Sequence, residues 1–303
     1  MEPNWQLARK QVTIIKRARI LQKIRAFFVD QGFIEVETPH RIPVNAPELH
    51  IDAATSEDWS LHTSPELCMK RLLAAGYDKL FQICRCWRSG ERSPYHLPEY
   101  TMLEWYRRDC DYHQLMDDCE QLILSLIENE DLTWQKKKID MSLPWSRITV
   151  ADAFSQHGSM PLHEVTDANF FSELISNEIE PGLPKNKPLF LIDYPVLQGS
   201  LARQKLHNPN QVERFELYIA GLELANGFSE LTDPTEQRRR FEEEEKQRRA
   251  AGKRPGPIPE KYINELECLA NAAGIALGID RLVMLLCDCQ VIDEVVCFTP
   301  EQL

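Results

Sequence analysis

Two glutamates in a predicted β-hairpin could hold a metal ion. Apolar and polar residues alternate over 214–225, and the Ala-Gly pair at 220–221 can form a two-residue turn. With this turn, Glu216 and Glu223 lie on the same face of the hairpin as diagonal neighbours, roughly 7 Å apart. Two like charges at this separation call for a cation, and Mg²⁺ bound to nucleotide phosphates uses one or two carboxylates. The hairpin therefore predicts a magnesium site beside a nucleotide.

Two arginines are candidates for binding the phosphates of that nucleotide. Arg88 ends a predicted strand, and Arg281 lies where a predicted helix opens and its backbone N–H groups favour anions. Planar guanidinium groups match the oxygens of a triphosphate, although each arginine taken singly is more often part of a structural salt bridge. The sequence contains neither a Walker loop nor a dinucleotide-binding Gly-rich turn. ATP would therefore be held by arginines, carboxylates and Mg²⁺.

One predicted strand places a carboxylate between two phenols. Tyr100, Met102, Glu104 and Tyr106 share one face, and the residues between them point to the other. This pattern favours a polar pocket, and the alternative is an exposed face with scattered polar groups.

The elements that must position these residues can also be predicted. An amphipathic helix is expected over 7–30, because apolar residues recur at helical spacing and Gln31-Gly32 can end it. Strands are predicted at 33–39, 80–88, 100–107, 188–194, 214–225 (the hairpin) and 274–278, and further helices at 115–129, 169–179 and from Asp280 onward. The loop 89–98 joins two strands of a hairpin, a place where functional residues gather. Residues 233–254, dense in Arg, Glu and Gln, are expected to form a solvated helix rather than a partner-binding arm.

Composition restricts the class of protein. The 303 residues are 43% hydrophobic and 27% charged, with no apolar run of membrane-spanning length and no signal peptide, which predicts a soluble cytoplasmic protein. Nine cysteines are too few for a disulfide scaffold, and Cys84/Cys86 and Cys287/Cys289 are expected to be small core residues rather than metal ligands. The net charge of -12 argues against a large RNA partner.

Three stretches resemble the motifs of class II aminoacyl-tRNA synthetases. They are a helix followed by a strand ending at Pro39, a strand-loop-strand containing Arg88, and Gly-Ile-Ala-Leu-Gly-Ile-Asp-Arg at 274–281. Residues 63–67, 98–106, 213–217 and 223–231 match the lysyl branch in order. The resemblance implies an α+β fold with an antiparallel sheet flanked by helices, one catalytic domain over 1–303, and a homodimer formed through the first helix and strand.

The resemblance also implies a reaction. Lysyl-tRNA synthetases carry an anticodon-binding domain before the first motif, whereas here that motif begins within the first turns of the chain, so no such domain is expected. In this respect, and in Ala276, the chain is similar to truncated ligases that attach (R)-β-lysine to a lysine of bacterial elongation factor P. The implied reaction is ATP-dependent activation of (R)-β-lysine, or lysine, as an adenylate, followed by amide formation on that side chain.

Carried over by position, the resemblance assigns a role to each site residue. Arg88 and His96 would contact the ATP phosphates, Tyr100 would stack on adenine, and Glu91 is the candidate for the adenine amino group. Arg281 would hold the γ-phosphate, and Glu216 and Glu223 would hold Mg²⁺, Glu223 also contacting ATP. The amino-acid pocket would be lined by Ser64, Glu66, Glu104, Tyr106, Asn226, Glu230 and Ala276. A substrate with two ammonium groups needs several carboxylates, as this set provides.

Two other functions remain open at this stage. A minimal synthetase would aminoacylate tRNA or a tRNA-like RNA, but the acidic net charge and the expected lack of an anticodon-binding domain count against it. A non-catalytic binding subunit would have no chemical need to keep Arg88, Glu216, Glu223 and Arg281 together.

Overall fold

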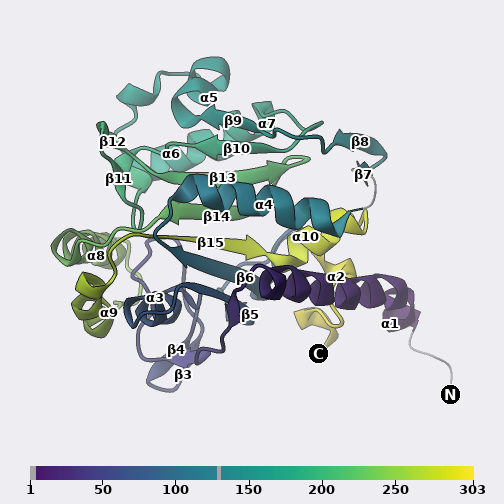
Figure 1. The fold of residues 1–303 in the computed structure, drawn as a ribbon, viewed down its shortest axis with the longest axis horizontal. Helices are drawn as coiled ribbons and strands as arrows, with labels where there is room; N and C mark the ends of the chain where they lie inside the picture. Colours follow the sequence, from purple (N-terminus) through teal and green to yellow (C-terminus); the bar gives the residue numbers. More distant parts are fainter. Residues whose placement is uncertain (1–4, 128–130) are drawn as a thin grey trace.

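An eight-stranded sheet forms the centre of the computed structural model, which describes residues 5–127 and 131–303 (Figure 1). The strands, in spatial order, are β1 (Ile34–Glu35), β5 (Lys79–Trp87), β6 (Glu99–Arg108), β15 (Ala272–Gly278), β14 (Leu222–Ser229), β13 (Arg214–Ile219), β10 (Leu189–Ile192) and β9 (Ser146–Thr149). The strands from β5 to β10 are antiparallel, and only the edge strands β1 and β9 pair in parallel. The predicted α+β fold with helices flanking an antiparallel sheet is confirmed.

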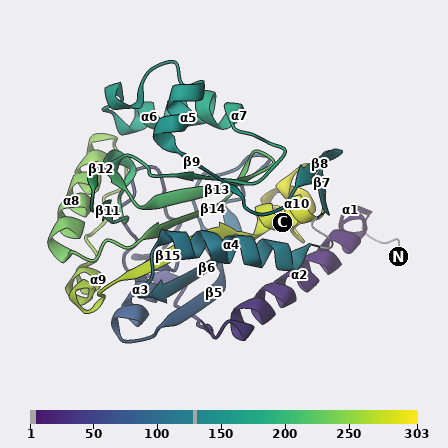
Figure 2. The same cartoon turned by 45° about the horizontal axis from the view of Figure 1, so that its top comes forward.

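Three helices cover one face of this sheet: α2 (Gln11–Asp30), α4 (Tyr112–Leu126) and α10 (Ile279–Leu286). Figures 1 and 2 show α2 and α4 side by side. In α2, Ile20, Ile24 and Phe28 recur at intervals of four residues and are buried. The Phe28 ring stacks on Phe81 at a centroid distance of 4.9 Å. This packing leaves the opposite face of the central strands for the site.

The remaining helices lie at the other face and at the β9 edge. On the side of β5 and β6 these are α3 (Glu66–Ala74), α8 (Pro234–Ala250) and α9 (Glu260–Glu265), and near β9 and β10 they are α5 (Val150–His157), α6 (Ala168–Leu174) and α7 (Glu180–Gly182) (Figure 1). Apolar residues of α3, α8 and α9 form a second core with Leu80 and Tyr106 of the sheet. Each of these helix groups therefore buries its apolar side against the strands.

The smaller elements are short hairpins and single helical turns. They are α1 (Trp5–Arg9), β2 (Arg41–Ile42), β3 (Thr55–Ser56), β4 (Trp59–Leu61), β7 (Asp131–Trp134), β8 (Lys137–Asp140), β11 (Gln204–Lys205), β12 (Asn208–Val212), the π-helical segment Ile175–Ile179 and the 3₁₀ helices Leu162–Glu164, Val196–Gln198, Leu266–Cys268, Ile292–Glu294 and Pro300–Gln302.

Most predicted elements lie within a few residues of the observed ones, and one strand was predicted too long. β1 contains only Ile34 and Glu35, because beyond Val36 the backbone no longer follows its neighbour: the Thr38 N–H donates to the Gln82 side chain, and Pro39 has no N–H. The predicted helix 115–129 is observed as α4, which begins three residues earlier, and predicted positions 128–129 lie outside the described residues.

In the described part of the chain, no helix is both long enough and apolar enough to cross a membrane.

Candidate active site

A cavity of about 1180 Å³ lies against the sheet face that carries Tyr100, Met102, Glu104 and Tyr106. The predicted alternation in β6 is correct, because Leu103 and Trp105 point instead into the core beneath α2 and α4. Strands β14 and β15 complete the floor, and part of α8 forms a wall. The cavity is somewhat larger than most ligand pockets, so it has room for two substrates.

A β-bulge determines which residues of β14 face this cavity. The hairpin turns at Ala220 and Gly221, both with positive φ as the two-residue turn requires. Tyr218 pairs with Glu223, but the register then shifts so that Glu216 pairs with Asn226. Without the shift, Ala225 would have been opposite Glu216. The bulge therefore brings Asn226 to the same face as both glutamates.

One end of the cavity is rich in cationic groups. Arg88 lies over the Tyr100 ring, with its guanidinium carbon 5.3 Å from the ring centre, and is 3.9 Å from Glu91. The Tyr100 hydroxyl donates to the carbonyl of Thr63 at 3.0 Å. Arg281 donates to the Glu223 carbonyl at 2.8 Å and lies 3.2 Å from its carboxylate. The five residues predicted to contact ATP at this end, together with Glu223, all line the cavity: Arg88, Glu91, His96, Tyr100 and Arg281.

His96 links this end together as a neutral imidazole. Arg281 can only donate, so its contact with Nε2 of His96 makes that nitrogen an acceptor. The proton then lies on Nδ1, which donates to the Ser93 hydroxyl at 2.7 Å. Burial, and after it the charge of Arg281, lowers the pKa of His96, which agrees with a neutral ring. His96 therefore orients Arg281 without adding a charge.

The other end of the cavity is acidic. Glu104 is fully buried and accepts hydrogen bonds from the Ser64 hydroxyl at 2.6 Å and the Tyr106 hydroxyl at 2.7 Å. Burial, followed by the nearby charge of Glu66, raises the pKa of Glu104 to about 8, although these two hydrogen bonds act in the opposite direction. Glu104 is therefore mostly protonated at neutral pH in the free protein, and an ammonium group beside it would favour its ionised form.

A buried lysine, which the sequence interpretation missed, separates two of the predicted substrate carboxylates. Lys70 lies 2.5 Å from Glu66 and also forms an ion pair with Glu230. Burial alone would lower the pKa of Lys70, but the carboxylates of Glu230 and Glu66 raise it well above its ordinary value, so the lysine is charged. The only signal in the sequence is the spacing of four residues between Glu66 and Lys70 on one helix.

These pocket residues belong to segments that match a known family. The family described as tRNA synthetases class II (D, K and N) matches residues 5–302. The chain belongs to this family.

Individual proteins of similar sequence indicate which members of this family the chain resembles. The chain is 36% identical to a protein of Edwardsiella ictaluri and 38% identical to one of Hamiltonella defensa, both named "Elongation factor P--(R)-beta-lysine ligase". A protein of Erwinia tasmaniensis with the same name is 36% identical. In each case the match covers 99% of this chain and 98% of the relative.

The two glutamates predicted to hold Mg²⁺ both have arginine partners. Glu216 is buried, with one carboxylate oxygen 2.6 Å from Arg214 and the other accepting from Tyr194 at 2.6 Å and Tyr218 at 2.7 Å. Glu223 is more exposed, faces the cavity and contacts Arg281. Charge balance alone therefore does not require a metal here. The two carboxylates do share a face, and Glu223 presents oxygens that suit Mg²⁺.

The floor between the two ends is formed by three neighbouring strands. Asn226, Ala276 and Glu104 lie opposite one another on β14, β15 and β6, and all three line the cavity. Next to them, a Cβ on Gly274 would lie 2.1 Å from the Tyr106 ring and 2.6 Å from Glu230. Glycine is needed at position 274 because Tyr106 crosses the strand there on its way to Glu104.

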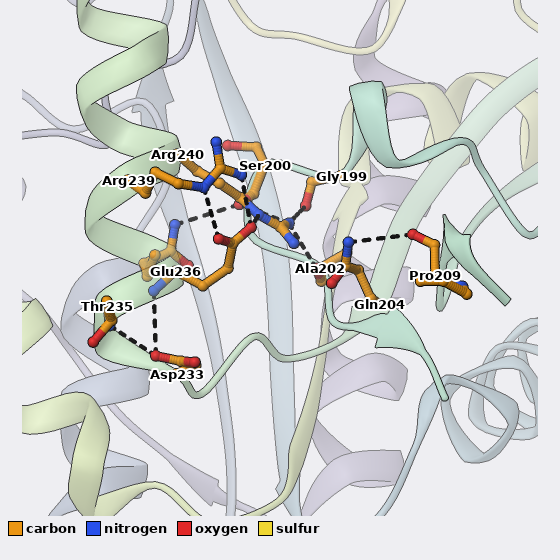
Figure 3. A network of polar contacts seen from close by, with 11 residues as sticks. Gly199, Ser200, Ala202, Gln204, Pro209, Asp233, Thr235, Glu236, Arg239 and Arg240 are labelled. Carbon is orange, nitrogen blue, oxygen red and sulfur yellow. Dashed lines mark hydrogen bonds and ion pairs between the residues drawn. The ribbon is translucent and has the colours of Figure 1, made fainter. Parts of the chain in front are cut away.

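Helix α8 is anchored to the segment that precedes β11 (Figure 3). The Asp233 carboxylate caps the helix by accepting from the N–H of Thr235 at 2.8 Å. The buried Arg240 donates to the carbonyls of Gly199 at 2.7 Å and Ala202 at 2.9 Å, and its Nε donates to Glu236 at 2.8 Å. These bonds fix the helix against the segment 199–202.

The helix expected over 233–254 is observed as α8, but the expectation that it is solvated is wrong for one of its sides. Arg240, Phe241, Glu245 and Arg248 are buried, and one side of the helix, including Glu244, lines the cavity. The charged residues were misleading because arginine can be buried when its guanidinium is satisfied by backbone carbonyls, a pairing that sequence does not reveal.

Proposed function

We propose that this chain activates (R)-β-lysine with ATP and transfers it to the ε-amino group of a lysine on elongation factor P. The proposal rests on the names of the relatives, whose sequences match this chain over nearly their whole length. The observation that carries it is the polarity of the cavity, with Arg88 and Arg281 at one end and Glu66 and Glu104 at the other. A triphosphate fits the first end and a lysine-like diamine fits the second.

In the first step a substrate carboxylate oxygen attacks the α-phosphorus of ATP. The bond from this phosphorus to the bridging oxygen breaks, and pyrophosphate leaves. No proton is transferred, so the step depends on position and charge. Arg88 would neutralise the charge on the α-phosphate, while Arg281, oriented by His96, would hold the γ-phosphate. The ammonium groups would be bound by Glu104, which ionises as it pairs, and by Glu66. Glu230 is fully buried behind the cavity and would act through its ion pair with Lys70.

In the second step the ε-amine of the acceptor lysine attacks the carbonyl carbon of the adenylate. The new C–N bond replaces the C–O bond to phosphate, AMP leaves and the amine loses a proton to solvent. The product is an amide on the carrier protein.

We further propose that Glu223, with Glu216 behind it, holds a Mg²⁺ ion bound to ATP. The metal would supply charge neutralisation at the phosphates. The exposed Glu223 carboxylate could bind it directly, with Arg281 turning from Glu223 toward phosphate.

A homodimer through α2 and β1 is also proposed. Apolar side chains are exposed along these elements and suit an isologous contact: Val12, Ile15, Val29 and Ile34.

All nine cysteines are free thiols, which fits the proposed cytoplasmic location.

Pyrophosphate exchange and protein mass together test the proposed function. ATP–pyrophosphate exchange is measured with α-lysine and with both enantiomers of β-lysine. The mass of elongation factor P is then measured by mass spectrometry after incubation with the chain, ATP and each of these amino acids. We expect exchange with (R)-β-lysine and a mass gain of one lysyl residue. Charging of total tRNA in a parallel reaction, with no change in elongation factor P, would refute the assignment and favour a minimal synthetase. Absence of exchange with every isomer would favour a binding subunit.

A further inference from the structure

Three metal-binding side chains meet beside the cavity, on the same face of the sheet as Met102 and Tyr100. Cys84 and Cys86 lie two residues apart on β5 and therefore point to the same face, opposite Met102 and Tyr100 of β6. His62 follows β4 and is held there because its carbonyl accepts from the N–H of Trp87 at 3.1 Å. Cys84 and Cys86 were expected to be simple core residues because no third ligand is near in sequence, but the fold supplies one 22 residues away.

The three donor atoms form a nearly equilateral triangle. The two sulfurs are 3.9 Å apart, and each lies 3.8 Å from Nε2 of His62. Two sulfurs bound to one tetrahedral zinc at about 2.3 Å would be separated by about 3.8 Å. Within residues 5–127 and 131–303, this is the only group of three His, Cys, Asp or Glu donors that approach one another so closely.

We propose that His62, Cys84 and Cys86 form a binding site for a Zn²⁺ ion. The site is buried, with 1% of His62, 7% of Cys84 and none of Cys86 exposed, so solvent does not compete with the three ligands. Two thiolates and a neutral imidazole around a divalent ion give no net charge, which suits a buried position better than a monovalent ion would.

Binding replaces protons at the ligands. Without metal, Nε2 of His62 donates to the carbonyl of Arg85 at 2.6 Å, because a carbonyl can only accept. Zinc displaces the two thiol protons to solvent, while the imidazole proton moves from Nε2 to Nδ1 so that Nε2 can bind the ion with the ring still neutral. The Arg85 carbonyl remains beside the ion as a further oxygen donor. The ion would join the segment after β4 to β5. Cys86 is two residues before Arg88 and opposite Tyr100, so the ion would stabilise the strand end that presents the predicted ATP contacts.

The second Cys-x-Cys pair provides a matched control for the test. Cys287 and Cys289 follow α10, and Cys289 approaches Thr13 rather than a histidine. The full-length protein is purified with a reductant, stripped with a chelator, and compared as wild type, C84S/C86S, C287S/C289S and His62→Gln. Zinc affinity is measured by competition with a chromophoric chelator, Co²⁺ is added as an optical probe of thiolate ligation, and circular dichroism verifies folding.

We expect about one Zn²⁺ per chain in the wild type and in C287S/C289S, with a thiolate-to-cobalt absorption band. Affinity should fall by roughly a hundredfold or more in C84S/C86S and His62→Gln, at least the loss seen when the support of a ligand is removed. Zinc should also raise the melting temperature of the wild type but not that of C84S/C86S. Equal zinc affinity in C84S/C86S and wild type, or binding of Cu⁺ without binding of Zn²⁺, would overturn the proposal, and these readouts do not depend on ligase activity.

Discussion

Protonation of Glu104 should make substrate binding depend strongly on pH. Its pKa of about 8 means that the carboxyl carries a proton in most free molecules at neutral pH. An ammonium group binds well only to the ionised form. The measured affinity therefore equals the affinity of the ionised form multiplied by the fraction of molecules in which Glu104 is ionised.

The size of the effect follows from this pKa. The ratio of protonated to ionised Glu104 is about 100 at pH 6 and about 10 at pH 7, so the affinity for lysine or β-lysine should rise about ninefold between these values. The same shift lowers stability. The ordinary pKa of a glutamate is 4.5. Above this pH the folded state binds more protons at Glu104 than the unfolded state does, so the free energy of unfolding falls as the pH rises toward 8. At pH 7 this costs about 3 kcal/mol of unfolding free energy.

The assay compares wild type, Glu104→Gln and Glu244→Gln between pH 6 and pH 7 by calorimetry. Glutamine at position 104 should remove most of the pH dependence and stabilise the free protein at pH 7, while weakening substrate binding. Glu244 also lines the cavity, and burial raises its pKa to about 7, so Glu244→Gln tests whether any titrating wall residue has the same effect.

Glu48, whose pKa burial raises to about 7 beside Arg88, also titrates near the cavity. It lies toward the phosphate contacts and should affect ATP affinity more than lysine affinity. An affinity for lysine that does not change with pH in the wild type, or an equal slope in wild type and Glu104→Gln, would refute the reasoning.

Four further predictions concern the same cavity and α2. Ala276→Gly should shift the kcat/KM ratio from (R)-β-lysine toward α-lysine by roughly 1–3 kcal/mol, because its methyl group lies on the floor between the two ends; a change below about twofold would leave it a packing residue. Glu223→Gln should slow pyrophosphate exchange roughly a hundredfold without changing the melting temperature, and unchanged exchange would contradict the magnesium assignment. Glu216→Gln should in addition lose about 3 kcal/mol of stability in denaturant titrations, because the buried Arg214 loses its ionic partner. The wild type should have a dimeric mass by light scattering and Ile15→Glu a lower one; a monomeric wild type would exclude the proposed interface.

Local patterns in the sequence determined much of this protein. The alternation from Tyr100 to Tyr106 correctly predicted which residues of β6 face the cavity, and the Ala-Gly turn correctly predicted the hairpin that carries Glu216 and Glu223. Such patterns are readable because a strand alternates its side chains at every second residue, and a two-residue turn needs positive φ at both positions. These properties depend on neighbouring residues alone.

Only the tertiary structure decided how these faces are charged and joined. The bulge that turns Asn226 toward the cavity, the pairing of Lys70 with Glu230, and the meeting of His62 with two cysteines have no local signal. Each arises when segments far apart in the chain pack together, and the low dielectric of the interior then fixes which buried groups pair and which carry protons.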